Sequence, residues 1–427
     1  MYKSNLLILG SGGREHIFAV KIAKSPFCEK LFIAPGNAGT SKVGTNVQIS
    51  ILDFEAIGVF ALENKIELIL VGPEDPLVAG IHDFFLANEN LKHISIIGPQ
   101  KAGAMLEGSK DFSKEFMVRN HIPTAAYSTF NLNQLTEGVA FLQKSNFPIV
   151  LKADGLAAGK GVVICETFDQ AEKELTEMLM NKKFGLASQK VVIEEFLEGI
   201  ELSVFVLTDG NSYKILPEAK DYKKVGIGEK GLNTGGMGSI SPVPFADEAF
   251  LETIENDIIK PSILGLQKEG IPFVGFLFIG IMKVGNDPFV IEYNVRMGDP
   301  ETQSVFSRIN NDLVELFRAV AKKDLHLQKL EIDPRTAVTV VLVSEGYPEE
   351  FEKNKIISGI ENVQNAEIFH AATIEKDGEI YSNGGRVLNC TSMNIDRFDA
   401  IQNAIANAGR IYYENRYFRS DIGFEFY

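Results

Sequence analysis

The sequence predicts a multidomain protein of α/β and α+β class that begins with an open, parallel α/β domain. At about 150 residues per domain, a chain of 427 residues corresponds to two to four domains. In the first hundred residues, short apolar runs that end in glycine turns alternate with helical segments, which is typical of a parallel sheet with crossover helices. From about Gln100 onwards the chain changes to longer helices and paired strands, which indicates further domains.

Four short apolar strands and two helices make up the predicted first domain. The strands are expected at residues 6–9, 31–34, 68–71 and 94–97, and the helices at residues 15–24 and 54–64. Ligands of open α/β sheets bind beyond the carboxyl ends of the strands. The glycine turns that follow these strands therefore mark the edge where we expect a ligand.

The first glycine turn, Gly10-Ser11-Gly12-Gly13, lies between a strand and a helix, where exposed amides bind phosphate. It is an incomplete dinucleotide fingerprint, because Glu15 stands at the third glycine position. The second strand also ends at Ala34-Pro35 without the acid that binds a ribose hydroxyl. The turn thus disfavours NAD and leaves a phosphate site and a simple tight turn as equal alternatives.

Longer helices and paired strands are expected in the rest of the chain. The helices are expected at residues 111–119, 169–180, 248–267 and 397–408, and Pro261 is expected to break or kink the third. The strands are expected at residues 148–153, 162–165, 191–196, 202–207, 213–216, 273–283, 288–295 and 338–343. A long glycine-rich loop is expected over residues 225–238.

A second glycine segment, GLAAGKG at residues 155–161, is close to a P-loop but does not match one. It has one residue too few between its glycines, and Gly161 stands where a P-loop has Ser or Thr. It also joins two strands rather than a strand and a helix. We expect a flexible hairpin whose amides and Lys160 cover phosphates, with Lys152 pointing to the same place. A plain hairpin turn is the alternative.

The segment VIEYNVRMGDPETQ at residues 290–303 is the most informative. Side chains alternate along a strand, so Glu292, Asn294 and Arg296 share one face. Carboxylate and amide oxygens suit magnesium, and a guanidinium neutralises charge on a transferred phosphoryl group. The alternative is a solvated polar face of a sheet. The preceding strand, expected at residues 273–283, contains no acid that would supply another ligand.

Composition and charge restrict the class of protein. The net charge of −15 argues against attraction to nucleic acid or to anionic membranes, and no apolar stretch is long enough to span a bilayer. The three cysteines lack CxxC spacing and the six histidines lack ligand spacing. We therefore expect a cytoplasmic protein with reduced thiols and no zinc or histidine metal site.

Taken in order, these segments resemble the ATP-grasp ligases and, among them, the phosphoribosylamine–glycine ligase family. The segments are GSGGREH (10–16), APGNAG (34–39), VGPEDP (71–76), LEGSK (106–110), LKADGLAAGKGV (151–162), VIEEFLEG (192–199), NTGGMG (233–238), 290–303 and NGGRVL (383–388). The resemblance implies an N-terminal substrate-binding domain over 1–105 and an ATP-grasp domain over 106–325. It also implies a small mobile lid at about 122–192 and a C-terminal mixed α+β domain over 326–427.

The resemblance also assigns residues to ligands. Around the ATP phosphates it implies Lys110, Lys152, Gly155, Gly159, Lys160 and Gly161. Around adenine and its ribose it implies Glu194, Glu195, Phe196, Leu197 and Glu201. For Mg²⁺ or Mn²⁺ it implies Glu292 and Asn294, and for catalysis Arg296, Lys152 and Glu292. For 5-phosphoribosylamine it implies Gly12, Gly13, Asp221, Lys223, Asn233, Thr234, Gly235, Gly236 and Arg296.

The implied reaction joins glycine to 5-phosphoribosylamine with ATP, through a glycyl phosphate, in de novo purine biosynthesis. Its products are glycinamide ribonucleotide, ADP and phosphate, and a monomer without nucleic-acid or membrane partners is expected. The chain departs from its relatives at Lys220, Tyr222 and Lys224, so only Asp221 and Lys223 carry over from that stretch. The alternatives are another ATP-grasp purine ribonucleotide carboxylase or formyltransferase, a non-catalytic nucleotide sensor and, least favoured, a dehydrogenase.

Overall fold

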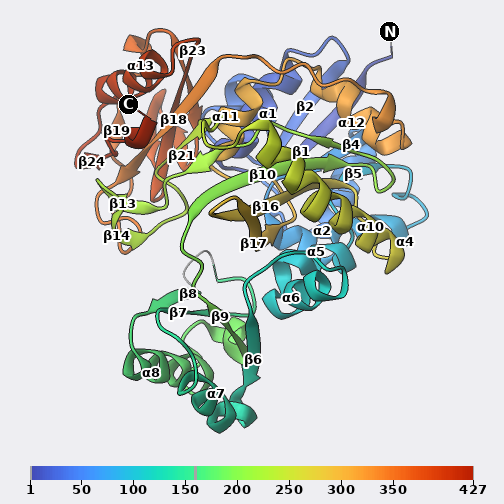
Figure 1. Cartoon of the computed structure of the whole chain (residues 1–427). Helices are drawn as coiled ribbons and strands as arrows, with labels where there is room; N and C mark the ends of the chain where they lie inside the picture. Colours follow the sequence, from blue (N-terminus) through green and yellow to red (C-terminus); the bar gives the residue numbers. More distant parts are fainter. Residues whose placement is uncertain (1, 158–160, 427) are drawn as a thin grey trace.

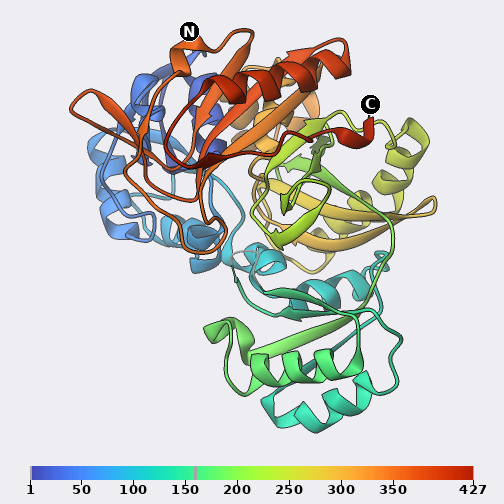
Figure 2. The ribbon, with the colours of Figure 1, turned by 90° about the vertical axis from the view of Figure 1, so that its left-hand side faces the viewer.

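The chain folds into a broad body and a small unit that projects from it (Figure 1). The computed structural model describes residues 2–157 and 161–426. The body carries the N-terminal, central and C-terminal sheets. The projecting unit, which we call the lid, contains the sheet formed between Tyr127 and Glu195. It also lies apart from the body in a view turned by 90° (Figure 2).

The N-terminal sheet is parallel throughout, in the order β3-β2-β1-β4-β5. Its elements are β1 Ser4–Gly10, α1 Gly13–Ala23, β2 Cys28–Pro35, β3 Thr45–Asn46, α2 Phe54–Glu63, β4 Ile66–Val71, α3 Glu74–Ala79, α4 Ile81–Ala87 and β5 Ser95–Ile97. Leu7 and Leu9 of β1 pack into one apolar cluster, whereas Leu6 and Ile8 pack into another. Both faces of the sheet are therefore buried, which confirms the predicted open α/β domain.

The lid is a four-stranded antiparallel sheet in the order β6-β9-β7-β8, with helices α7 and α8 packed against it. Its elements are β6 Tyr127–Asn131, α7 Leu135–Leu142, β7 Ile149–Ala153, β8 Val162–Cys165, α8 Phe168–Leu179 and β9 Lys190–Glu195. Leu142, Leu175 and Ile193 belong to an apolar cluster drawn entirely from the lid. The lid thus has its own small core.

The central sheet is antiparallel, in the order β11-β10-β16-β17. Its strands are β10 Ile200–Thr208, β11 Tyr213–Ile215, β16 Gly275–Val284 and β17 Asp287–Asn294, and helices α5 Lys101–Gly108 and α6 Lys110–Arg119 lie beside it. The predicted pairing of the last two strands is confirmed. The pairing register shifts at Gly280/Ile281, opposite the segment that leads to Glu292.

Pro261 does not end the predicted helix over 248–267. The helix continues as α9 Glu248–Ile254, a π turn over Glu255–Ile259, and α10 Lys260–Lys268. Proline lacks an N–H group and clashes with the preceding helical turn, and the wider π turn lies where that conflict falls.

The C-terminal sheet combines strands that are far apart in the sequence, in the order β12-β15-β18-β23-β20. These are β12 Lys220–Asp221, β15 Gly238–Ser241, β18 Thr336–Ser344, β20 Ala366–His370 and β23 Arg386–Asn394, and α13 Arg397–Arg410 packs on them. Because β12 and β15 lie within the predicted range 106–325, this sheet joins the central and C-terminal parts. The domain boundaries themselves stay a prediction.

The expected loop over 225–238 contains a short hairpin, which corrects that prediction. Its strands are β13 Lys224–Gly226 and β14 Lys230–Asn233. The remaining elements are α11 Glu301–Ser307, α12 Leu313–Lys322, β19 Ile356–Ile357, β21 Thr373–Lys376, β22 Glu379–Ser382 and β24 Arg416–Tyr417.

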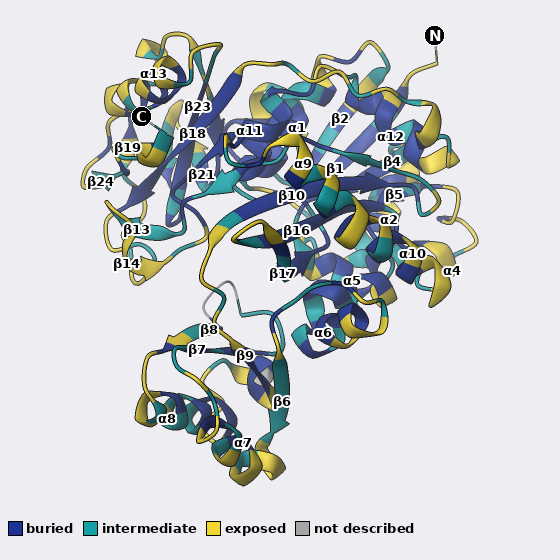
Figure 3. Cartoon of the chain, in the orientation of Figure 1, coloured by how far each residue is buried: buried dark blue, intermediate teal, exposed yellow. Residues whose placement is uncertain are grey.

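The strands of the body are mostly buried, and the outer faces of the lid helices are exposed (Figure 3). Within residues 2–157 and 161–426, no helix is long and apolar enough to cross a membrane.

Candidate active site

The predicted phosphate and metal residues converge where the lid meets the body. Lys152 is the penultimate residue of lid strand β7, and its Nζ donates to the backbone carbonyl of Ile291 at 2.9 Å. Lys110 opens helix α6, and its Nζ donates to the carbonyl of Gly155 at 3.2 Å. Both lysines act electrostatically on Glu292 of β17. Three distant segments of the chain thus supply one cluster.

The Glu292 carboxylate is ionised and half-buried. Burial raises its pKa, but Lys223, Lys152, Lys110 and Arg296 together hold the pKa below its usual value. The neighbouring Asn294 is buried, its Oδ1 accepts from Arg296 at 3.2 Å, and its Nδ2 has no partner within the described chain. An ionised carboxylate and an amide oxygen on one strand suit a hard divalent cation.

The oxygen donors present fit magnesium better than a metal held wholly by protein. In the part of the chain that the structure describes, no group of three or more His, Cys, Asp or Glu side chains is arranged to hold a metal. Magnesium usually takes one or two carboxylates and completes its shell with water and substrate phosphates. Glu292 and Asn294 are consistent with that pattern.

The glycine hairpin at 155–161 is anchored where it leaves the lid sheet. Asp154 Oδ1 accepts from Ser109 Oγ at 2.9 Å and from the backbone N–H of Asp111 at 2.8 Å. The backbone N–H of Ala153 donates to Gly161 O at 2.8 Å. The antiparallel pairing of β7 with β8 confirms a strand-to-strand hairpin rather than a P-loop. Gly159 and Lys160 lie outside the described residues.

The residues implied for adenine lie at the end of β9. Glu194 is buried, and its carboxylate lies 3.0 Å from both Lys114 Nζ and Lys152 Nζ. Glu195 is exposed, and its Oε1 accepts from the backbone N–H of Ala126 at 2.8 Å. Phe196 and Leu197 follow the strand. The Glu194 side chain therefore points to two lysines.

Glu201, implied for the ribose, forms an ion pair with Lys223 at 2.5 Å. Burial opposes the charge of Lys223, but Glu201, Asp221 and Glu292 raise its pKa well above the usual value. Burial raises the pKa of Asp221 to about 6, with further contributions from Glu201 and Glu292. Burial and the neighbouring Asp221 raise the pKa of Glu301 to about 8. Lys223 lowers the pKa of Asp221, Glu292 and Glu301, and so offsets part of the negative charge of this group of acids.

Arg296 lies just beyond β17 and is held by two acids that the sequence analysis did not assign. Its guanidinium donates to Glu107 Oε1 at 2.8 Å and to Glu74 Oε2 at 3.1 Å. Burial raises the pKa of Glu107 to about 7, although Arg296 opposes that shift. Burial also acts against ionisation of Glu74, yet Arg296 and Arg14 lower its pKa to about 2. Arg296 is therefore a fixed, oriented cation.

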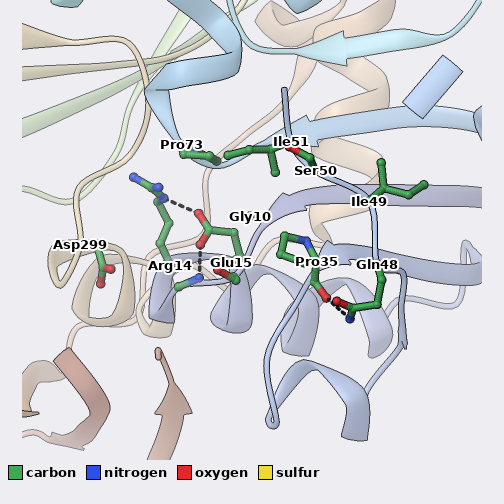
Figure 4. A pocket seen from close by; sticks show the side chains of 12 residues that line it. Gly10, Arg14, Glu15, Pro35, Gln48, Ile49, Ser50, Ile51, Pro73 and Asp299 are labelled. Atoms are coloured by element: carbon green, nitrogen blue, oxygen red, sulfur yellow. Dashed lines mark hydrogen bonds and ion pairs between the residues drawn. The ribbon is translucent and has the colours of Figure 1, made fainter. Parts of the chain in front are cut away.

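A cavity of about 530 Å³ opens beyond the carboxyl ends of β1, β2 and β4 (Figure 4). Gly10, Ser11, Gly12, Arg14, Glu15 and Asp299 are among its lining residues. Glu15 Oε2 accepts from the backbone N–H of Gly12 at 2.6 Å, so the side chain at the third glycine position braces the turn itself. A side chain at Gly13 would overlap the amides of Asn389 and Gln303, so Gly13 marks a close packing contact.

The loop Asn233-Thr234-Gly235-Gly236 connects this cavity to the C-terminal sheet. Arg386, at the start of β23, donates to the carbonyl of Gly235 at 2.6 Å, and its Nη2 lies 3.1 Å from Asp299 Oδ2. The backbone N–H of Gly235 donates to the hydroxyl of Tyr347 at 3.0 Å. At Gly236, φ is +114° and a side chain would overlap Pro300, so this position requires glycine.

Three domains of one known protein family match most of the chain. They are the N domain of phosphoribosylglycinamide synthetase over 4–107, its ATP-grasp (A) domain over 108–302 and its C domain over 337–425. The chain belongs to the phosphoribosylglycinamide synthetase family. The phosphoribosylamine–glycine ligases of Pasteurella multocida and Vibrio vulnificus are 45% and 43% identical, and each alignment covers 98% of this chain and 97–98% of the relative.

Solved structures agree with this assignment. The crystal structure of phosphoribosylamine–glycine ligase from Thermotoga maritima has a TM-score of 0.84 and 34% identity, and the match covers 98% of this chain and 99% of that one. Biotin carboxylase from Campylobacter jejuni has a TM-score of 0.71, with 99% and 94% of the two chains covered. At 16% identity the second likeness concerns the fold alone.

The side chains of residues 220–223, which form β12 (Lys220–Asp221) and the two residues after it, point alternately to opposite sides. Asp221 and Lys223 act on Glu292, on the side of the site. Lys220 and Tyr222 point the other way, to the C-terminal segment: Lys220 forms an ion pair with Glu425, and the Tyr222 hydroxyl donates to Glu425 Oε2 at 3.0 Å. The side chains of Asp221 and Lys223 are thus on the other side from the substituted Lys220 and Tyr222.

Proposed function

We propose that the protein is a phosphoribosylamine–glycine ligase. It joins glycine to 5-phosphoribosylamine with ATP and releases glycinamide ribonucleotide, ADP and phosphate. The observation that carries the proposal is the convergence of Lys110, Lys152, Lys223 and Arg296 on Glu292, in a chain that belongs to this family along its length. Such a concentration of cations beside an ionised carboxylate suits a bound nucleoside triphosphate and its divalent ion.

The nucleotide is proposed to lie between the lid and the body. The hairpin at 155–161, Lys110 and Lys152 bind the phosphates, and Lys152 is held toward β17 by its bond to Ile291. Glu292 and Asn294 are the residues that would hold Mg²⁺ or Mn²⁺, which supplies further neutralisation of phosphate charge when bound. Adenine lies against the segment from Glu194 through Leu197, to which Glu194 contributes its backbone because its side chain is turned to Lys114 and Lys152. Glu201 is directed to the ribose.

Two steps account for the chemistry. The glycine carboxylate attacks the γ-phosphoryl group, giving glycyl phosphate and ADP, while Arg296 and Lys152 neutralise the charge that develops. The amine of 5-phosphoribosylamine then attacks the acyl carbon, and phosphate leaves as the amine loses a proton. The closed lid excludes water, which would otherwise hydrolyse the acyl phosphate.

The phosphoribosylamine is proposed to bind where the N-terminal and C-terminal parts meet. We assign its binding to Gly12, Asp221, Lys223 and the loop 233–236. In support, Asp299 lies between the first turn and that loop, and the backbone N–H of Thr234 in the loop donates to Lys223 O at 2.8 Å. Gly13 supports the same turn from behind, through its contact with Asn389 and Gln303. We further propose a monomer that acts in the cytoplasm without nucleic-acid or membrane partners.

Release of ADP, measured while each component is omitted in turn, tests the function. 5-Phosphoribosylamine is generated in the cuvette, so that the acyl acceptor of the second step is present during the assay. ADP that requires glycine, the amine and a divalent metal together supports the ligase. ADP that follows bicarbonate or formate instead identifies a sister carboxylase or formyltransferase. Binding of ATP with no ADP under any combination identifies a nucleotide sensor.

A further inference from the structure

A buried chain of charges links helix α6 to the lid and to strand β17. Lys114 Nζ lies 3.0 Å from Glu194 Oε2, and Lys152 Nζ lies 3.0 Å from Glu194 Oε1. The exposed fractions of Lys114, Glu194 and Lys152 are 2%, 3% and 8%. One carboxylate therefore holds two lysines away from solvent, and the three side chains carry a net charge of about +1 at neutral pH.

The two lysines are connected to consecutive backbone carbonyls of the strand that carries Glu292, Lys152 directly and Lys114 through Thr124. Lys152 donates to Ile291 O at 2.9 Å. Lys114 donates to Thr124 Oγ1 at 2.8 Å, and that hydroxyl donates in turn to Val290 O at 2.6 Å. The chain of charges is thus attached to the two residues that precede Glu292.

Lys114 also lies at the connection through which the chain enters the lid. Its Nζ donates to the carbonyl of Ala125 at 3.3 Å and lies 5.5 Å from the ring centre of Tyr127, the first residue of β6. The backbone of this connection pairs with β17, since Val290 N–H donates to Pro123 O at 2.8 Å. Lys114 belongs to α6 and contacts both this connection and β9, so its side chain restrains the lid relative to α6.

The donor count distinguishes the two lysines. An ammonium group has three N–H donors. Those of Lys114 face Glu194, Thr124 and Ala125, so none is left for a nucleotide. Within residues 2–157 and 161–426, Lys152 donates a hydrogen bond to Ile291 O and forms an ion pair with Glu194, so at least one donor stays available for a phosphate oxygen.

We propose that Lys114 is a positioning residue that, through Glu194, sets Lys152 and the lid relative to the strand that carries Glu292 and Asn294. The inference deepens the proposed function, because it assigns Lys114 a role in the binding of the same ATP. Lys114 does not touch the substrate. With Lys114 absent, Glu194 has Lys152 as its single cationic partner, and the positive charge that Lys152 offers to phosphate is offset.

Lys114→Met tests the proposal, with ADP and Mg²⁺ as the binding probe in calorimetry. We expect the Kd for ADP and the KM for ATP to rise about tenfold, or about 1.4 kcal/mol, while the KM for glycine changes less than about twofold. Lys190→Met is the matched control. Lys190 also joins β9 to α6, by an ion pair with Asp111 at 2.5 Å, but its side chain is 47% exposed and it does not contact Lys152.

A double variant separates positioning from simple loss of stability. Lys114→Met lowers the net charge of the three side chains to about zero, and Lys114→Met/Glu194→Gln restores it to about +1. We expect the double variant to recover much of the ADP affinity, which a purely structural defect would not do. Thr124→Val, which removes one partner of Lys114, should shift the Kd in the same direction by less, and it serves if Lys114→Met fails to fold.

The proposal is overturned if Lys114→Met and Thr124→Val bind ADP as the wild type does, or if the double variant binds no better than Lys114→Met. These titrations need neither glycine nor the amine. A wild-type protein that binds ADP but makes no glycinamide ribonucleotide would contradict the proposed function and leave the role of Lys114 open to the same binding test.

Discussion

The guanidinium of Arg296 donates to the carboxylate of Glu107 at 2.8 Å, across 189 residues of sequence. Glu107 lies near the end of α5, and its other oxygen accepts from the backbone N–H of Val295 at 2.7 Å. One buried carboxylate therefore holds both the backbone and the side chain of the segment that follows β17. This contact fixes where the positive charge of Arg296 lies relative to Asn294 and Glu292.

We expect Glu107→Ala to destabilise the protein by about 3 kcal/mol, because it leaves a buried guanidinium short of one acid. Glu74 still pairs with Arg296, so the fold itself should survive. Urea unfolding at neutral pH measures the change. Glu63→Ala, at an exposed position of α2, is the control and should change the unfolding free energy by less than about 0.5 kcal/mol. An equal effect of the two substitutions would contradict the role of Glu107.

Glu292→Gln should abolish turnover and leave the fold intact. The carboxylate is ionised among four cations, so its replacement by a neutral amide removes the charged oxygen donor proposed for the metal and the negative charge that those cations share. We expect kcat to fall at least about 100-fold, a loss of about 2.7 kcal/mol of transition-state stabilisation. Binding of Mn²⁺, followed by its electron paramagnetic resonance signal, should weaken in parallel.

The matched control for Glu292→Gln is Asp287→Asn, on the same strand but exposed at the hairpin turn. It should retain wild-type kcat and Mn²⁺ binding. Near-normal turnover of Glu292→Gln would refute the metal assignment, whatever the control shows.

Local patterns predicted more of this molecule than long-range contacts did. The parallel sheet, the lid hairpin and the pairing of β16 with β17 followed from apolar runs and glycine turns. The hairpin β13/β14 was missed because its strands are short and glycine-rich, and the π turn before α10 depends on how the helix relieves the Pro261 conflict. Such features follow from packing rather than from periodicity.

The same distinction holds in the candidate site. Strand alternation placed Glu292 and Asn294 together because both lie on one strand. The pairs Arg296–Glu74 and Arg386–Asp299 join residues 222 and 87 positions apart, and no spacing rule connects them. These four residues lie in segments that carried the family resemblance. The resemblance therefore indicated which segments contribute to the site, but not which residues pair with one another. The role of each predicted ligand residue stays a prediction.

Arg386→Met should weaken the binding of phosphoribosylamine more than that of ATP. Its guanidinium fork holds the carbonyl of Gly235 and the carboxylate of Asp299, which keeps the loop 233–236 beside the cavity. Loss of charge-assisted hydrogen bonds of this kind costs about 1.5–3 kcal/mol. We expect the KM for the amine to rise at least about tenfold while the KM for ATP changes less than about twofold.

Arg410→Met, on the exposed end of α13, is the control for Arg386→Met and should leave both KM values unchanged. Equal increases in the two KM values for Arg386→Met would indicate a general loss of structure and would contradict the specific role.

The buried pair His16 and His370 should make the protein sensitive to acid. His16 Nδ1 accepts from the backbone N–H of His370 at 2.7 Å, which joins α1 to the C-terminal sheet. Burial, aided by His370, lowers the pKa of His16 to about 3. Burial, aided by Lys42, lowers the pKa of His370 to about 4, although Glu375 opposes that shift. Both rings are therefore neutral in the folded state near neutral pH.

In the unfolded chain each imidazole takes up a proton near pH 6.5, so the unfolded state binds more protons between that pH and the folded pKa values. Stability is complete above about pH 6.5 and falls as the pH drops, by about 1.4 kcal/mol per unit for each ring, until the folded rings also titrate. His16→Asn keeps an acceptor and removes one titrating group, so urea midpoints between pH 4.5 and 6.5 should depend less steeply on pH. His93→Asn, at an exposed position, should retain the wild-type slope, and an identical slope for His16→Asn would disprove this linkage.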